Sequence, residues 1–175
     1  MLEAISPACS RCEIAGSIRR EKPEVKDIEI VAIVNSYEEL FNGVRKHGRF
    51  IKPGVSDIID WEPKVDAKYL RVMLHEEIKL DLFIATPDNW AGIFLMRTGS
   101  GVGSNGSPFS GFIPGMFSRF KKLSNGGKMI GGIPTMPSGE QLLLVEEEDF
   151  FELLEMNFVP PKERTDRKVI KLYIK

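Results

Sequence analysis

The sequence predicts an α+β fold, with a mixed β-sheet in the first half of the chain and a smaller α+β subdomain in the second half. The chain has 175 residues and is 42% hydrophobic, which is typical of one globular domain or of two small ones. Its expected elements run strand, helix, strand, strand, and then helix, hairpin, helix. We therefore expect one domain over residues 1–86 and a second over residues 87–175.

The first half contains a strand and a helix with clear sequence signals. A short helical segment is expected within residues 1–12. Residues 27–34 are rich in β-branched side chains and alternate in polarity, which predicts a strand. The Ser-x-x-Glu pattern that begins at Ser36 is typical of a capping box. It predicts a helix that runs to about Lys46 and is closed by Gly48.

Two further strands are expected over residues 69–74 and 78–84. The short segment between them has a length that suits a hairpin. In the second strand, the apolar side chains recur at every other position and share one face. Lys79 and Asp81 therefore share the other face.

The second half contains a helix, a long loop and a group of shorter elements. Thr86-Pro87-Asp88 is typical of a helix start, and it predicts a helix that ends at Gly99. Glycine and serine dominate residues 99–115, which predicts a long loop. The remaining elements are expected to be helices over residues 116–122 and 147–156 and strands over residues 128–130 and 141–145.

Composition and charge exclude several classes of protein. No stretch approaches the ~20 consecutive apolar residues of a membrane span, and the first residues lack a secretory pattern, so we expect a cytoplasmic protein that does not bind membranes. Cys9 and Cys12 are expected to be free thiols in a reducing compartment. The net charge of -1 gives no overall attraction to nucleic acid, so any basic surface must be local. The segment Lys162–Lys175 is one such basic stretch.

Three carboxylates lie within strands whose alternate residues are apolar: Asp27, Glu29 and Asp81. Two acids at positions i and i+2 project from a strand about 7 Å apart. Two metal ions ~3.5–4 Å apart, as in phosphoryl-transfer sites, could bridge that separation. If the two strands are neighbours, all three carboxylates meet. A solvated sheet face, with Lys79 as an ion-pair partner, explains the pattern equally well.

A second group of residues upstream could hold an anion. A Gly16-Ser17 turn that leads into a helical start offers backbone N–H groups and a hydroxyl, and Arg20 adds a forked donor for phosphate oxygens. A Gly-Ser pair alone is usually only a turn. Its occurrence before an Asp-x-Glu strand makes the combination more specific.

These motifs together resemble a known family. Gly16-Ser17-Ile18-Arg19-Arg20 followed by Asp27-Ile28-Glu29-Ile30 resembles the signature of the nucleotidyltransferase superfamily, and more closely that of the family X DNA polymerases related to DNA polymerase beta. Three later segments are similar to the family's third-carboxylate strand, its nucleotide-contacting turn and its closing element, in that order: Lys79-Leu80-Asp81-Leu82, Arg97-Thr98-Gly99-Ser100 and Pro161-Lys162-Glu163-Arg164. The resemblance extends from about Cys12 to Arg164.

The resemblance implies a polymerase palm over residues 1–86 and a C-terminal nucleotide- and template-binding subdomain over residues 87–175. Asp27 and Glu29 would hold two Mg²⁺ ions, for which Mn²⁺ can substitute. Asp81 would bind the catalytic metal and help to take the proton from the primer 3′-hydroxyl.

The resemblance also implies the residues that contact the nucleotide and the DNA. The incoming triphosphate would be held by Gly16, Ser17, Arg20 and the backbone at Lys26. The nucleotide would be contacted by Arg97, Thr98, Gly99 and Ser100. The DNA contacts would be Lys79 near the primer-terminal phosphate and Arg119, Lys121 and Lys122 on the template, although a solvated helix face explains the last three equally well.

The implied enzyme is a DNA-directed DNA polymerase that adds dNMP to a primer 3′-hydroxyl and fills short gaps in DNA repair or replication. Its partners would be gapped or primer–template DNA and a dNTP, and we expect a monomer. The form is similar to minimal viral or phage members that lack the lyase domain. Two alternatives remain: a nucleotidyltransferase acting on RNA, a single-strand end or a small molecule, and a weakly catalytic DNA-end-binding protein.

Two departures from the family pattern bear on activity. Glu29 stands where the polymerases usually carry Asp, and its longer side chain could change the metal preference. Met96-Arg97 precedes the Thr-Gly-Ser turn, where family members usually have an aromatic pair that helps to exclude ribonucleotides. The sequence pattern therefore does not predict whether the enzyme selects deoxyribonucleotides over ribonucleotides.

Overall fold

The computed structural model describes residues 1–55 and 57–175. These residues form an α+β structure that divides into two units. The first unit comprises Met1–Ile18 and Lys22–Thr86, and the second comprises Arg19–Glu21 and Pro87–Lys175. Within the described residues, no helix is both long and apolar enough to cross a membrane.

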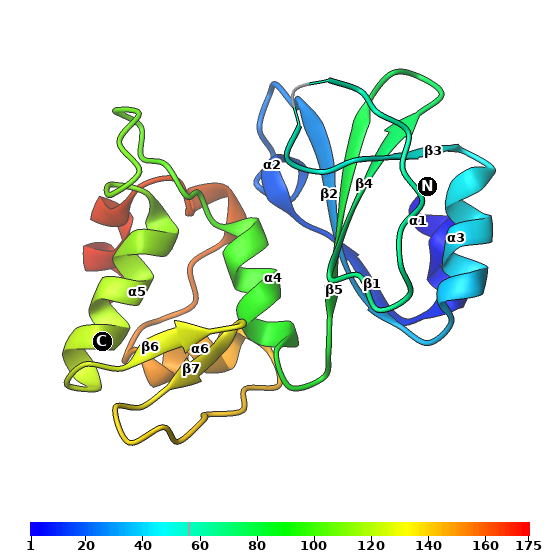
Figure 1. Cartoon of the computed structure of the whole chain (residues 1–175). Helices are drawn as coiled ribbons and strands as arrows, with labels where there is room; N and C mark the ends of the chain where they lie inside the picture. Colours follow the sequence, from blue (N-terminus) through cyan, green and yellow to red (C-terminus); the bar gives the residue numbers. More distant parts are fainter. Residues whose placement is uncertain (56) are drawn as a thin grey trace. The chain divides into compact units, whose positions relative to one another are not determined.

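The first part of the chain alternates short helices with the strands of one sheet (Figure 1). Its elements, in chain order, are α1 (Leu2–Ile5), the 3-10 turn η1 (Ser6–Ala8), β1 (Cys9–Ile14), α2 (Gly16–Arg19), β2 (Asp27–Val34), α3 (Tyr37–Arg45), β3 (Gly48–Ile51), β4 (Tyr69–Leu74) and β5 (Lys79–Ala85).

The rest of the chain is mainly helical, with one small hairpin (Figure 1). Its elements are α4 (Trp90–Thr98), α5 (Phe112–Leu123), β6 (Lys128–Ile130), β7 (Ile133–Thr135), α6 (Glu147–Leu153), and the 3-10 turns η2 (Pro161–Glu163) and η3 (Arg167–Leu172).

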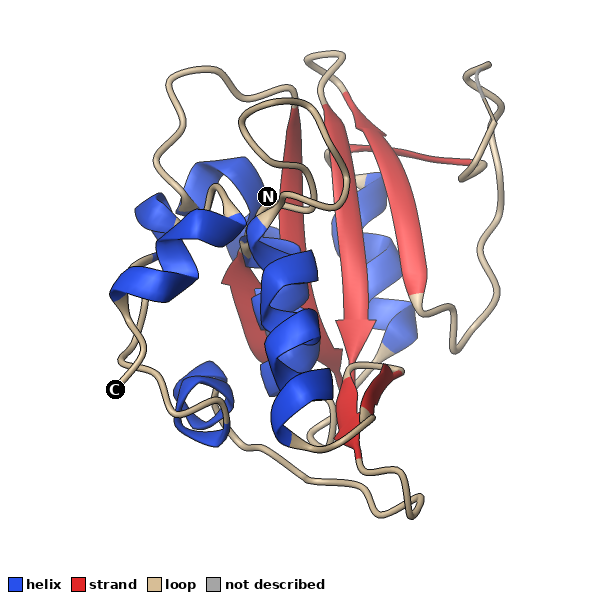
Figure 2. Cartoon of the chain, turned by 90° about the vertical axis from the view of Figure 1, so that its left-hand side faces the viewer, coloured by secondary structure: helices blue, strands red, loops and turns tan. Residues whose placement is uncertain are grey.

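The sheet of the first unit is mixed, and the described residues place its five strands in the order β1-β2-β5-β4-β3. The pair β2 and β5 is parallel, while the other neighbours are antiparallel. Figure 2 shows the long strands side by side. The hairpin expected over residues 69–84 is confirmed as β4 and β5, and its second strand lies beside β2.

One face of this sheet carries the hydrophobic core of the first unit. Alternate residues of β2 and β5, such as Ile30 and Leu82, pack there against Leu40 and Val44 of α3. The start of α3 confirms the expected cap, because the Ser36 side chain accepts a hydrogen bond from the backbone N–H of Glu39 at 3.2 Å. The alternating pattern leaves the polar residues of β2 and β5 on the opposite face.

The short helical segment expected within residues 1–12 is confirmed as α1, and it ends in the turn that contains Pro7. Residues 9–14 form a strand that the sequence did not predict, because the chain there pairs with β2. One expectation for the first unit is wrong. Gly48 does not close α3, which ends at Arg45; it begins β3 instead. A Cβ atom at Gly48 would collide with the backbone of Met73 on β4, so the close pairing of these strands requires glycine.

The second unit also departs from several expectations. Helix α4 begins at Trp90 after Asn89, and not at Thr86, although Gly99 ends it as expected. Helix α5 begins at Phe112, four residues earlier than expected. Residues 141–145 do not form a strand, because β7 pairs with β6 instead. Gly131 and Gly132 both have positive φ and form the tight turn between these strands.

The core of the second unit contains apolar side chains from several elements, and helices α5 and α6 contribute its aromatic residues. Phe112, Met116 and Phe120 of α5 pack with Phe150 and Phe151 of α6. The glycine-rich loop before α5 is tied to the C-terminal segment, since the Ser104 hydroxyl donates to the Asp166 carboxylate at 3.0 Å.

A buried ionic cluster lies beside this core. The carboxylate of Glu147 accepts hydrogen bonds from Arg164 at 2.7 and 3.2 Å and from Arg19, whose Nη1 lies 3.0 Å away. Glu147 is 2% exposed and Arg164 is fully buried. Burial alone would raise the pKa of Glu147, but the hydrogen bonds from the two arginines outweigh it and hold this pKa below its ordinary value.

We predict that Glu147→Gln lowers the free energy of unfolding by about 3–5 kcal/mol, because it leaves two guanidinium groups without their counter-charge. The control is Glu148→Gln, which changes the next residue of the same helix, an exposed side chain. Urea unfolding of both variants at neutral pH measures the difference. Equal losses in the two variants would contradict the structural role of Glu147.

The same cluster predicts a pH dependence. The pKa of Glu147 is lower in the folded chain, so its contribution to stability is present above the ordinary glutamate pKa of about 4.3 and is lost as the pH falls through the lowered value. The wild-type chain should therefore lose more stability than Glu147→Gln between neutral and acidic pH. Urea midpoints measured across that range test this, and parallel curves for the two proteins would disprove it.

Candidate functional site

The three predicted carboxylates lie on neighbouring strands of the first unit. In the parallel pair of β2 and β5, Glu29 is opposite Asp81, and Asp27 is opposite Lys79. Paired residues on adjacent strands lie about 4.8 Å apart and project to the same face. Because Ile30 and Leu82 point into the core, the three carboxylates belong to the opposite face. The strand of Asp27 and Glu29 and the strand of Asp81 are therefore neighbours, as the sequence analysis required for the three carboxylates to share one site.

The glycine before Ser17 allows a close approach by one of these carboxylates. Gly16 has a φ of +63°, and a Cβ atom there would collide with the Oε2 of Glu29. The Glu29 side chain thus lies directly against the Gly16 backbone. Glycine fits here for two reasons, since it tolerates positive φ and leaves room for the carboxylate. The structure in this way joins the predicted Gly-Ser turn to the predicted acidic strand.

The hydroxyl of Ser17 has no partner in the described part of the chain. The residue is partly exposed, but its Oγ atom is inaccessible to solvent and makes no hydrogen bond there. A buried polar atom without a partner costs about 1–3 kcal/mol, and such atoms are rare in native proteins.

Asp81 is held by two residues of β4 that the sequence analysis did not single out. The Arg71 guanidinium donates to both carboxylate oxygens, from Nε at 2.7 Å and from Nη2 at 2.8 Å. The Tyr69 hydroxyl donates to Oδ1 at 2.7 Å. Asp81 is 5% exposed. Its ion-pair partner in this structure is therefore Arg71, which is opposite it in the β4–β5 register.

These contacts shift the pKa values of both donors. Burial, followed by the hydrogen bond to Asp81, raises the pKa of Tyr69 to about 12. The hydrogen bonds to Asp81 also raise the pKa of Arg71 above its already high value. Tyr69 is therefore a neutral donor near pH 7, and Arg71 is a permanent cation.

The carboxylates of Asp27, Glu29 and Asp81 are suitable ligands for a hard divalent cation, and the β2–β5 register places them on one face of the sheet. Carboxylate oxygens are the ligands that Mg²⁺ prefers, and here three of them share one face of two adjacent strands. Among the described residues, however, no group of three or more His, Cys, Asp or Glu side chains is assembled as a metal site. The Asp81 oxygens point to Arg71 and Tyr69 instead. A cation here must share or displace those contacts.

The predicted nucleotide-binding residues of the second unit make internal contacts. Thr98 is fully buried; its hydroxyl accepts a hydrogen bond from Arg19 at 2.8 Å, and its carbonyl accepts one from Arg20 at 2.6 Å. The backbone N–H of Ser100 donates to the Arg164 carbonyl at 2.9 Å. Gly99 lies tightly against Ile113. In this structure, Arg20 therefore helps to fix the Thr98 turn.

The predicted basic residues of α5 line a hollow with the C-terminal segment. Arg119 and Lys122 of α5 and Arg167 and Lys171 of η3 line a cavity of about 280 Å³, mainly with the apolar parts of their side chains. No acidic side chain of the described residues lines it. Arg119 is also tied to the Leu154 carbonyl by a 2.6 Å hydrogen bond. Lys121, Lys122, Lys26 and Lys79 are exposed.

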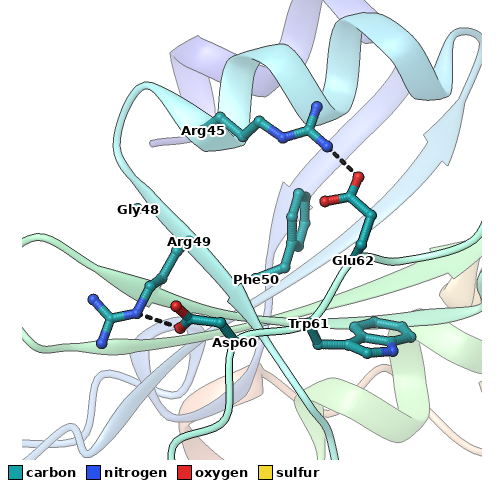
Figure 3. A pocket seen from close by; sticks show the side chains of 7 residues that line it. All are labelled: Arg45, Gly48, Arg49, Phe50, Asp60, Trp61 and Glu62. Atoms are coloured by element: carbon teal, nitrogen blue, oxygen red, sulfur yellow. Dashed lines mark hydrogen bonds and ion pairs between the residues drawn. The ribbon is translucent and has the colours of Figure 1, made fainter.

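The first unit has a hollow of its own, of about 410 Å³, at the edge strand β3 (Figure 3). None of the predicted site residues lines it. Arg45 pairs there with Glu62, and Arg49 pairs with Asp60 at 2.7 Å. Each charge of this hollow already faces an opposite charge. It offers a ligand less electrostatic attraction than the carboxylate face does.

No protein-family model and no curated protein matches this chain.

We predict that Gly16→Ala displaces the Glu29 carboxylate and, if this carboxylate is a metal ligand, weakens Mn²⁺ binding by about tenfold or more. The matched control is Gly54→Ala. Gly54 also has a positive φ, of +76°, but a Cβ atom there meets nothing within 4 Å. Both variants should lose about 1 kcal/mol of stability from backbone strain. Mn²⁺ titration by electron paramagnetic resonance separates them, and equal affinities would refute the placement of Glu29.

Proposed function

We propose that this chain is a metal-dependent nucleotidyltransferase of the family X DNA polymerase type, which adds dNMP to a primer 3′-hydroxyl. One observation carries the proposal. Asp27, Glu29 and Asp81 share a face of the β2–β5 pair, and the Gly16 turn, followed by the orphaned Ser17 hydroxyl, lies against Glu29. Phosphoryl transfer requires carboxylates that hold cations, together with hydrogen-bond donors that hold the phosphate groups of the substrate beside them.

The chain's own residues would act mainly by positioning. Asp27 and Glu29 would hold the cations, and the Ser17 hydroxyl would donate to a non-bridging oxygen of the triphosphate. Asp81 would orient the primer 3′-hydroxyl and accept its proton at a carboxylate oxygen. Lys79, opposite Asp27, would contact the primer-terminal phosphate. Two Mg²⁺ ions, when bound, would supply the charge that stabilises the attacking and leaving oxygens.

The DNA would contact the chain through local basic surfaces. The net charge of -1 gives no general attraction to a polyanion. Four cationic side chains of α5 and η3, those of Arg119, Lys122, Arg167 and Lys171, lie around one hollow, which they line mainly with their apolar parts. The charged ends of these side chains would contact nucleic-acid phosphates at its rim.

We predict that Asp27→Asn lowers the extension rate by at least about a hundredfold, because the substitution removes the charge of a metal ligand and keeps its shape. The control is Asp88→Asn, at an exposed carboxylate of the second unit, which should extend at the wild-type rate. The assay uses a one-nucleotide-gapped duplex and an unpaired single strand, each with one dNTP or its rNTP and with Mg²⁺ or Mn²⁺.

The substrate arms of this assay separate the candidate functions. Extension of the gapped duplex by the complementary dNTP supports a template-directed polymerase. Extension of the single strand by any nucleotide indicates a terminal transferase. If DNA is bound but neither strand is extended with either metal, or if Asp27→Asn extends as fast as the wild type, the proposal fails.

We predict that DNA affinity falls steeply with salt and that Lys122→Gln makes the dependence shallower by about one unit of log K per log salt concentration, because one phosphate contact is lost. Lys46→Gln is the control, at an exposed position of the first unit. Fluorescence anisotropy between low and moderate salt measures both slopes. If Lys122→Gln and Lys46→Gln give the same slope, Lys122 does not contact DNA.

A further inference from the structure

We propose that Arg71 is a displaceable internal counter-cation of the carboxylate face, which competes with a divalent cation for Asp81. The inference rests on the proposed function, since it concerns the same metal site. It assigns a positioning and regulatory role to Arg71, and a supporting role to Tyr69. Neither residue belongs to the motifs that predicted the site.

The contacts of Asp81 account for most of its capacity to accept hydrogen bonds. An ionised carboxylate offers about four acceptor sites on its two oxygens. Arg71 fills one on each oxygen, and Tyr69 fills a second one on Oδ1. A cation that binds an Asp81 oxygen directly must take the remaining site or displace one of these donors. Oδ1 is open to a cation only if Arg71 or Tyr69 releases it, and on Oδ2 a cation would lie beside the positive charge of Arg71.

The location of the pair argues against a role in stability alone. Within the described part of the first unit, the pairs Arg45–Glu62 and Arg49–Asp60 are exposed and lie away from the predicted ligands. The Arg71–Asp81 pair is largely buried and uses a predicted ligand directly opposite Glu29. Without a metal, the guanidinium of Arg71 supplies the positive charge that faces the Asp81 carboxylate. A bound cation would supply the same charge.

The exposure of Arg71 would allow its contact with Asp81 to be exchanged for a contact with a cation. Arg71 is 26% exposed at its side chain, while Asp81 is 8% exposed, so the arginine has a path toward solvent and the aspartate does not. Its guanidinium can keep one hydrogen bond to Asp81 while it releases the other. Arg71 would then hold the ligand in place before the metal arrives and yield one oxygen when it binds.

The test measures Mn²⁺ affinity by electron paramagnetic resonance, on the full chain without DNA or nucleotide. We expect Arg71→Gln to bind Mn²⁺ about tenfold more tightly than the wild type, because a competing positive charge is removed. Arg71→Lys keeps the charge but not the two-pronged contact, and it should fall between the two. Arg49→Gln removes the same charge from the exposed pair on β3 and should match the wild type.

Activity gives a second readout with a distinct signature. In Arg71→Gln, the Mg²⁺ concentration for half-maximal extension should fall, while the maximal rate stays equal or decreases because Asp81 is less well oriented. A merely structural role would lower stability without tightening metal binding. If Arg71→Gln is too unstable to measure, Arg71→Lys must still bind Mn²⁺ more tightly than the wild type.

Variants of the carboxylates separate this inference from the proposed function. If Asp27→Asn and Asp81→Asn weaken Mn²⁺ binding but neither Arg71 variant tightens it, the competition is refuted and the metal site stands. If the two carboxylate variants leave Mn²⁺ binding unchanged, both proposals are overturned. The graded order of wild type, Arg71→Lys and Arg71→Gln, with Arg49→Gln unchanged, is the result that supports the inference.

Discussion

The parallel pairing of β2 with β5 is the constraint on which the candidate site depends. It places Glu29 beside Asp81, and the period of two along each strand assigns all three carboxylates to the face opposite the core. A register shift of one residue would turn these acids into the core and expose Ile30 and Leu82. Burial of the apolar face therefore fixes the positions of the polar one.

The two units neutralise their acidic groups in different ways. Glu147 is held by two arginines, of which Arg164 is fully buried and Arg19 is partly exposed. Asp81 is held by one arginine, Arg71, which is also partly exposed. The buried Arg164 gives Glu147 a counter-charge that does not depend on Arg19, whereas Asp81 has no second arginine among the contacts described here, so loss of Arg71 leaves its charge less compensated.

The sequence predicted the elements whose signals are local. The alternation of residues 27–34, the cap at Ser36 and the hairpin over residues 69–84 are each confirmed. The strand at Cys9–Ile14 was missed because its residues alternate weakly, and pairing with β2 decides its structure. The β7 strand was missed because it has only three residues and contains Pro134, which disfavours a strand, so its structure depends on pairing with β6.

For the candidate site too, residues with a local sequence signal were predicted and those placed by strand pairing were not. The carboxylates and the Gly-Ser turn were found from spacing, while Arg71 was not, because its relation to Asp81 depends on the β4–β5 register. Sequence spacing along one strand identifies which acids share a face, but only the cross-strand register identifies the cation that faces them. In the structure, the cation that faces Asp81 is Arg71, which lies opposite it in the β4–β5 register and donates to both of its carboxylate oxygens.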